Sequence, residues 1–309
     1  MTSKESKENS YTAWLICCRP KTWGISLSPV VVGLVFSFWH LHDLNWSIAL
    51  ATALLSILMQ TISNMENDAA YTKRKAERTN RKGLPRATSL GLLSIQQVEK
   101  AIFFLIGLTI IDTGYLLYQG GWIIVLISLS SVIAAYFYMG GSKPLAYTPF
   151  SEIVCFTFFG LIAVGGTFFL QTKTLELDVV LAGCAVGSLA SAVLVVNNYR
   201  DIHHDRSVQR NTLAVVIGRK KTRQLYACLL YLPFLICILI TALSPTLFPI
   251  VATLLLLPKC RNLVRDLQIL EGNQLNSVLF STVKLELLFS LLLSSLIVFS
   301  AFLQYSLLD

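Results

Sequence analysis

Two clusters of polar residues interrupt a chain that is otherwise mostly apolar. The first reads NMEND at residues 64–68 and the second reads NNYRDIHHD at residues 197–205. Residues four apart share one face of a helix. Two such faces result: Asn64 with Asp68, and Asn197 with Asp201 and Asp205. Carboxylate and amide oxygens are hard ligands that suit Mg²⁺, which proteins usually bind through one or two carboxylates together with substrate phosphates.

Cations accompany both clusters. Carboxylates alone would repel a phosphate, so a diphosphate site also requires positively charged donors. Arg78 and Arg81 follow the first cluster, Arg200 and Arg206 lie within the second, and Lys143 falls at the same predicted level. The residue types therefore indicate a site for a magnesium-bound diphosphate.

The composition indicates an integral membrane protein. Of 309 residues, 54% are hydrophobic and 14% are charged, with a mean hydropathy of +0.64, whereas soluble domains carry about 25% charged residues. The seven cysteines form no CxxC pair, so we interpret them as buried apolar residues. The net charge of +8 arises in short segments between apolar runs, which predicts orientation in a lipid bilayer and no binding to nucleic acid.

Apolar segments long enough to cross about 30 Å of hydrocarbon fill most of the chain. They are residues 22–42, 44–65, 101–119, 120–142, 153–172, 179–199, 224–258 and 287–308. The run 224–258 is too long for one crossing, and Pro245 and Pro249 mark a turn that divides it. The sequence predicts an all-α bundle of nine transmembrane helices, with residues 1–21 as a cytoplasmic N-terminal segment and residues 22–309 as a single membrane domain.

The basic residues predict the orientation of this bundle. They collect before the first apolar segment and in two polar loops, roughly 66–100 and 200–223, whereas the opposite side receives Lys173. This asymmetry places the N-terminus and both loops in the cytoplasm. Four segments separate the two polar clusters, so both emerge on one side and can face a central cavity that opens to the cytoplasm. A single acid at a helix end is more often merely solvated, but two clusters on one side favour a binding site.

Several ordered motifs resemble the UbiA superfamily of intramembrane aromatic prenyltransferases, and most closely its 1,4-dihydroxy-2-naphthoate polyprenyltransferase branch. The resemblance runs almost from end to end. Its motifs are RPKTW at 19–23, SNMEND at 63–68, GSKPLAY at 141–147, NNYRDIHHDRSVQRNTLAVVIG at 197–218 and LNSVLFSTVKLELLF at 275–289.

The resemblance implies a Mg²⁺-dependent enzyme of menaquinone biosynthesis in the cytoplasmic (inner) membrane. It would transfer a polyprenyl chain from polyprenyl diphosphate to 1,4-dihydroxy-2-naphthoate, release diphosphate and CO₂, and form demethylmenaquinone. The implied catalytic residues are Asp68, Asp201, Asp205 and Lys143. The implied diphosphate-binding residues are Arg78, Arg81, Lys143 and Arg200. The implied metal ligands are Asn64, Asn67, Asp68, Glu77, Asn197, Asp201 and Asp205.

The first cluster departs from the family pattern, which reads NDxxD with a further acid six residues on. Aligning this pattern on Asn67 and Asp68 puts Tyr71 and Glu77 at the two later acids. A Tyr does not replace a carboxylate ligand. Either Asn64 and Asp68 hold the metal or this half of the site depends on Glu77; we favour Asn64, Asn67 and Asp68 together.

Other functions compete with this interpretation. A UbiA-type enzyme could use another aromatic acceptor, such as 4-hydroxybenzoate or homogentisate, and an altered first cluster could mark a protein that binds prenyl diphosphate without turnover. A secondary transporter is disfavoured because inverted repeats place equivalent motifs on opposite membrane faces, whereas both clusters here are predicted on one side.

Overall fold

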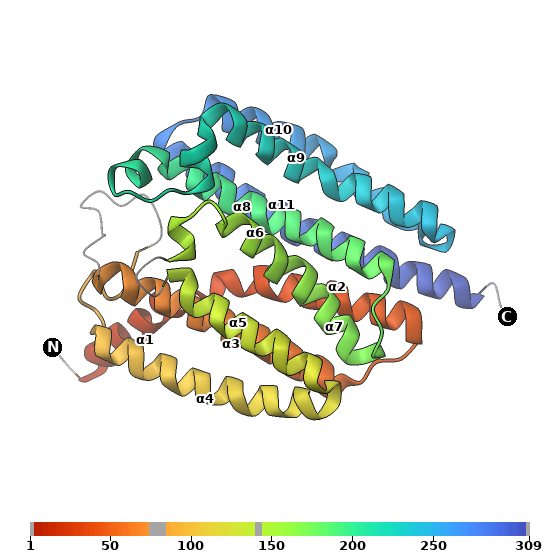
Figure 1. Ribbon diagram of the computed structural model, residues 1–309, viewed down its shortest axis with the longest axis horizontal. Helices are drawn as coiled ribbons and strands as arrows, with labels where there is room; N and C mark the ends of the chain where they lie inside the picture. Colours follow the sequence, from red (N-terminus) through yellow and green to blue (C-terminus); the bar gives the residue numbers. More distant parts are fainter. Residues whose placement is uncertain (1–2, 74–84, 140–143, 307–309) are drawn as a thin grey trace.

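The computed structural model describes residues 3–73, 85–139 and 144–306, and the regular structure in these ranges is all helical (Figure 1). The first half contains α1 (Ser3–Cys18), α2 (Trp23–Leu41), α3 (Trp46–Lys73), α4 (Ile95–Gly120) and α5 (Trp122–Met139). The second half contains α6 (Ser151–Phe156), the π-helical η3 (Thr157–Ile162), α7 (Ala163–Thr172), α8 (Leu177–Ser207), α9 (Leu213–Leu243), η4 (Pro245–Leu256), α10 (Leu257–Ile269) and α11 (Leu275–Ser306). Short 3₁₀ turns are η1 (Pro20–Thr22), η2 (Leu145–Tyr147) and η5 (Gly272–Gln274).

These helices confirm the predicted all-α membrane fold. Within the described ranges, eight helical segments are long and apolar enough to cross a membrane, and Trp122–Tyr138 forms a shorter apolar helix. The long helices run side by side (Figure 1). On α4, the side chains of Phe103, Phe104, Ile110 and Ile111 are exposed, as expected for a helix that faces lipid rather than water. The chain is therefore a multi-pass membrane protein.

Several helix ends lie away from the positions that the apolar runs predicted. The loops were expected to begin near residues 66 and 200, but α3 continues to Lys73 and α8 to Ser207. Both polar clusters therefore lie within helices. α11 begins at Leu275 rather than near residue 287. An apolar run gives the length of the segment that can cross hydrocarbon. The helix itself is longer, because it continues through polar residues that form hydrogen bonds beyond the membrane core.

Within the N-terminal segment, for which the sequence analysis predicted no secondary structure, residues 3–18 form α1. Its buried Ala13 and Cys17 pack with Met65 and Ala69 of α3. This contact holds the start of the chain against the helix that carries the first polar cluster.

Helix α8 forms the centre of the main core. Val186, Leu189, Val196 and Tyr199 are all at most 1% exposed and belong to one cluster with residues of α2, α9 and α11. The second polar cluster is thus an extension of the most enclosed helix, which fixes its position in the bundle.

Glycines bring η3 against α8. A Cβ atom added to Gly160 would lie 2.4 Å from the carbonyl oxygen of Gly183, and one added to Gly187 would lie 2.6 Å from the carbonyl oxygen of Phe156. Gly183 and Gly187 form the small-xxx-small spacing that allows close backbone approach between membrane helices. This contact sets the distance between α8 and the wall that η3 contributes to the cavity described next.

Candidate active site

A cavity of about 670 Å³ lies between helices α2 to α8 and α11. Along α3 its wall runs from Thr52 to Asn67, which corresponds to roughly 22 Å of helix. Most of its lining is apolar or weakly polar, with Phe158 and Phe159 of η3 and Phe280 of α11 among the large side chains. Its polar end combines residues from three parts of the chain: Arg19, Lys21, Asn64, Asn67 and Asn197. An apolar bore with a few convergent polar groups is the usual form of a ligand site.

The first cluster is oriented by the N-terminal segment. The Asn64 side-chain amide donates hydrogen bonds from Nδ2 to the Cys18 carbonyl at 3.0 Å and to Thr22 Oγ1 at 2.9 Å. A backbone carbonyl only accepts, so these bonds fix which end of the Asn64 amide is nitrogen. The amide oxygen remains as the acceptor of this cavity residue.

Asp68 has a different environment from Asn64. It is fully buried, and its carboxylate accepts hydrogen bonds from the backbone N–H groups of Ala87 and Thr88, each at 2.9 Å, and from Thr88 Oγ1 at 2.5 Å. Asp68 does not line the cavity among the described residues. Its carboxylate anchors the segment after Pro85 to the end of α3.

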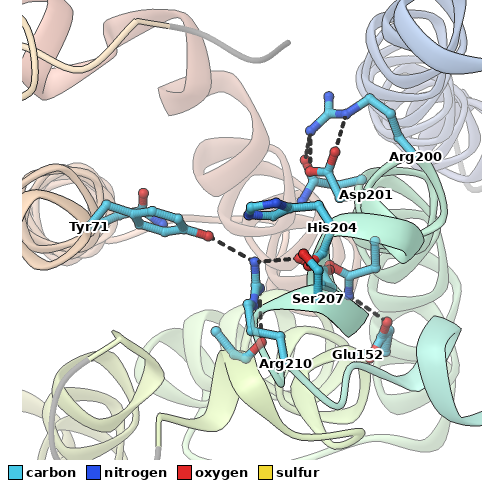
Figure 2. A network of polar contacts seen from close by, with 12 residues as sticks. Tyr71, Glu152, Arg200, Asp201, His204, Ser207 and Arg210 are labelled. Carbon is cyan, nitrogen blue, oxygen red and sulfur yellow. Dashed lines mark hydrogen bonds and ion pairs between the residues drawn. The ribbon is translucent and has the colours of Figure 1, made fainter. Parts of the chain in front are cut away.

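The second cluster contains a guanidinium with several partners. Arg200 contacts Asp201 through Nη2–Oδ2 at 2.8 Å and Nε–Oδ1 at 3.1 Å (Figure 2). It also donates to Asn197 Oδ1 at 2.8 Å and to Asn276 Oδ1 of α11 at 2.7 Å. Asn197 lines the cavity, and Asp201 lies one helical turn beyond it.

Arg210 joins the two clusters, as Figure 2 shows. Its Nη1 donates to the Tyr71 hydroxyl at 2.8 Å and contacts Asp205 Oδ1 at 3.2 Å, while Nη2 donates to the Ala146 carbonyl at 2.9 Å. Burial alone would lower the pKa of Arg210, but the adjacent Tyr71 and Asp205 raise it above its usual value. The guanidinium therefore remains charged and ties α3 to α8.

Tyr71, which occupies the place of a family acid, contacts a second arginine. The guanidinium carbon of Arg86 lies 3.5 Å from the centroid of the Tyr71 ring. Arg86 also donates from Nη2 to Asn67 Oδ1 at 3.3 Å. Tyr71 therefore packs against one guanidinium and accepts a hydrogen bond from another.

The predicted site residues fall into three groups. The structure brings Asn64 and Asn67 of α3 and Asn197 of α8 to one cavity, with Asp201 and Arg200 beside Asn197. Asp68 and Asp205 are fully buried and contact the 87–88 backbone and Arg210, respectively. The remaining predicted residues lie outside the described part of the chain: Glu77, Arg78, Arg81 and Lys143.

Sequence reasoning missed several polar residues at this end of the bundle. Arg19, Lys21, Arg86 and Arg210 were counted only as orientation signals, yet the first two line the cavity and the others hold polar cluster residues. The available signal was position in the sequence. Arg19 and Lys21 belong to the RPKTW motif and Arg210 to the NNYRDIHHDRSVQR motif, and Arg86 follows the first cluster. Glu152 was also missed: its carboxylate accepts from Asn198 Nδ2 at 2.8 Å.

The side chains at the polar end of the cavity supply few oxygen ligands for Mg²⁺. No group of three or more His, Cys, Asp or Glu side chains suited to a metal ion occurs among residues 3–73, 85–139 and 144–306. The nearest oxygens at this end come instead from Asn64 on the cavity wall and from Asp201, one helical turn beyond Asn197. Such a sparse set suits Mg²⁺ when substrate phosphates and water complete its coordination.

The comparison with known proteins agrees with the cavity and its motifs. The UbiA prenyltransferase family model matches residues 26–269. The 1,4-dihydroxy-2-naphthoate octaprenyltransferase of Haemophilus influenzae is 31% identical over 270 residues, covering 84% of this chain and 87% of that protein. The protein with the same name from Mycobacterium leprae is 34% identical over 224 residues, covering 72% and 74%.

The fold is also shared with solved structures. A UbiA homolog from Archaeoglobus fulgidus bound to GPP and Mg²⁺ has a TM-score of 0.69 at 14% identity, over 92% of this chain and 99% of that one. The resemblance drawn from the sequence motifs is thus confirmed. This chain belongs to the UbiA prenyltransferase family and is a membrane-embedded prenyltransferase.

Proposed function

We propose that this prenyltransferase transfers a polyprenyl chain from polyprenyl diphosphate to 1,4-dihydroxy-2-naphthoate, with release of diphosphate and CO₂, giving the prenylated hydroquinone that a separate two-electron oxidation converts to demethylmenaquinone. The observation that carries the proposal is one cavity whose polar end unites the two clusters and whose remaining wall is largely apolar. The relatives from Haemophilus influenzae and Mycobacterium leprae, which carry the naphthoate enzyme's name, support the acceptor.

The apolar wall suits the prenyl chain. Each buried CH₂ group gains about 0.8 kcal/mol by leaving water, so a donor with many such groups favours a site inside the membrane. The diphosphate then lies at the polar end, within reach of Arg19 and Lys21. These cations stabilise the negative charge that develops as the allylic C–O bond breaks and its electron pair passes to the diphosphate oxygen.

Mg²⁺ would be held by Asn64 and Asp201 together with diphosphate oxygens, and when bound it neutralises charge on the leaving group. Arg200 positions Asp201 through two hydrogen bonds. Outside the described residues, Lys143, Arg78 and Arg81 add further cations to the proposal, and Glu77 a further carboxylate.

The residues of the cavity wall agree with an acceptor that loses CO₂. The ring carbon that bears the carboxylate donates an electron pair to the first carbon of the prenyl chain. The electrons of the ring–carboxylate bond then return to the ring as CO₂ leaves, so no proton is removed. Among the described residues the wall contains no Asp, Glu or His, and prenylation at a ring carbon that loses CO₂ needs no base.

We place the site in the cytoplasmic membrane with the N-terminus and the polar end of the cavity toward the cytoplasm. The support is the concentration of basic residues around α1, the end of α3, the α8–α9 connection and α10. The two substrates would then meet at the boundary between lipid and cytoplasm.

An acceptor panel tests the proposal. Purified protein in lipid nanodiscs is incubated with geranyl or longer prenyl diphosphate, Mg²⁺ or EDTA, and one acceptor at a time. We expect prenylated product with 1,4-dihydroxy-2-naphthoate and Mg²⁺ only. Product with 4-hydroxybenzoate or homogentisate alone would assign a different acceptor, and binding without product for every acceptor would indicate a non-catalytic protein.

A further inference from the structure

The three asparagines on the cavity wall do not present the same atoms to it. Asn64 donates from Nδ2 to the Cys18 carbonyl and to Thr22. Asn67 and Asn197 instead accept at Oδ1, from Arg86 at 3.3 Å and from Arg200 at 2.8 Å. A carbonyl only accepts and a guanidinium only donates, so the partner dictates the orientation of each amide.

This chemistry sorts the asparagines into two kinds. Asn64 has its two N–H donors directed to the α1–α2 connection and keeps its oxygen for the cavity. Asn67 and Asn197 have their oxygens directed to arginines and keep their NH₂ groups. An amide oxygen suits a cation, whereas an amide N–H suits a phosphate oxygen.

The arginine that orients Asn67 is itself held in place. Its ring partner, Tyr71, is fixed by the hydrogen bond from Arg210. Its backbone is fixed because Asp68 accepts from the N–H groups of the next two residues, Ala87 and Thr88. The ring face of Tyr71 and the anchored backbone at residues 87–88 therefore position the Arg86 guanidinium at Asn67.

Arg200 orients Asn197 on α8 as Arg86 orients Asn67 on α3. It is 7% exposed at the side chain and contacts Asn197, Asp201 and Asn276 at once. Because three partners hold the guanidinium, the Asn197 oxygen cannot turn toward the cavity without losing a charge-assisted hydrogen bond.

We propose that Asn67 and Asn197 are diphosphate-binding residues that donate through their side-chain amides, with Arg86 and Arg200 as the residues that position them, while Asn64 presents its oxygen to the metal. Tyr71, in the place of a family acid, acts through Arg86 as a positioning residue. The inference rests on the proposed function and gives Asn64 a task different from that of Asn67 and Asn197 in the same cavity.

Matched Asn→Asp variants distinguish the two kinds of asparagine. Asp has the shape of Asn but only accepts hydrogen bonds. At a diphosphate donor it introduces repulsion and removes the donor, whereas at a metal ligand it supplies a better ligand. We measure binding of geranyl S-thiolodiphosphate, which is not cleaved, by isothermal titration calorimetry in nanodiscs with Mg²⁺ and with EDTA.

We expect N67D and N197D to weaken binding of the analogue roughly 10- to 100-fold with Mg²⁺ and also with EDTA. N64D loses its donation to the Cys18 carbonyl but supplies a better metal ligand, so its binding of the analogue should depend more strongly on Mg²⁺ than that of the wild type. N262D, on the exposed face of α10, serves as the matched control and should bind as the wild type does. Y71L removes the ring under Arg86 and should weaken binding, whereas Y71F loses only the hydrogen bond from Arg210 and should weaken binding less.

Wild-type affinity in N67D and N197D, or tighter binding by them with Mg²⁺, would overturn the inference, because it would make their oxygens the functional atoms. Thermal unfolding of each variant separates lost binding from lost folding, and N67A serves as a second, uncharged variant that should weaken binding less than N67D. Failure of the wild type itself to bind the analogue would overturn the proposed function.

Discussion

Tyr71 of α3 and Asp205 of α8 contact the same nitrogen of one guanidinium, Nη1 of Arg210, at 2.8 and 3.2 Å. This shared contact explains how the chain accommodates Tyr in place of a family acid. The tyrosine does not supply a ligand; it connects the first polar cluster to the second. The arrangement of the two clusters thus depends on residues that are not themselves on the cavity wall.

Removal of this connection should destabilise the protein. Arg210→Ala leaves the fully buried Asp205 carboxylate without its guanidinium, which costs about 3–5 kcal/mol when one partner of a buried ion pair is lost. We expect a clear decrease in the unfolding temperature followed by intrinsic fluorescence in detergent. Arg261→Ala, at an exposed position of α10, is the control, and equal unfolding temperatures for the two variants would contradict the structural role of Arg210.

The two acids Asp68 and Asp201 should respond differently to truncation. Asp68→Ala leaves the backbone N–H groups of Ala87 and Thr88 without their acceptor, at a cost of roughly 3 kcal/mol in unfolding free energy. Both stability and turnover should therefore decrease. Asp201→Ala removes the carboxylate partner of the nearly buried Arg200 guanidinium but leaves its bonds to Asn197 and Asn276, so stability should decrease less than in Asp68→Ala.

Turnover by Asp201→Ala should nonetheless decrease on the order of 100-fold or more, as expected for loss of a group that stabilises the developing charge. Initial rates of diphosphate release, together with chemical unfolding curves, check both acids. An Asp201→Ala enzyme with full activity would remove Asp201 from the proposed site.

The contact between η3 and α8 should tolerate no additional methyl group. Gly160→Ala would place Cβ 2.4 Å from the Gly183 carbonyl oxygen and 2.7 Å from the Gly187 Cα atom, and overpacking of this kind costs about 1–3 kcal/mol. Because η3 also forms the cavity wall, activity should decrease with stability. Gly107→Ala of α4, where nothing lies within 4 Å of the new atom, should leave the unfolding temperature unchanged.

Binding of Mg²⁺ should depend on the diphosphate. The oxygens that the described residues bring to the cavity end form a sparse set, so Mg²⁺ alone should leave the unfolding temperature nearly unchanged. Mg²⁺ with geranyl S-thiolodiphosphate should raise the unfolding temperature. When the analogue is at 100 times its Kd, the free energy of unfolding should increase by about 2.7 kcal/mol. A large increase with Mg²⁺ alone would instead require a site built from the protein's own ligands.

The sequence predicted the features that depend on composition and periodicity. Apolar runs predicted the membrane helices because crossing hydrocarbon demands about 20 apolar residues regardless of tertiary contacts. The two polar clusters drew attention to Asn64, Asn67 and Asn197, which the structure places around one cavity.

The orientation of those side chains could not be predicted in the same way. Asn67 is turned by Arg86, which is 19 residues away, and Asn64 by the Cys18 carbonyl, 46 residues away. Asp68 resembles a ligand in its motif, yet its carboxylate holds the 87–88 backbone. Such contacts depend on which distant segments meet, and a pattern within one helix contains no information about them.

The most direct test of the central claim follows the fate of the acceptor's carboxylate. Wild-type protein with Mg²⁺, a prenyl diphosphate and 1,4-dihydroxy-2-naphthoate labelled with ¹⁴C at the carboxyl group should release ¹⁴CO₂ and diphosphate in equal amounts, and EDTA should abolish both. Diphosphate release with the label retained in a prenylated product, or with no prenylated naphthalene at all, would contradict the account.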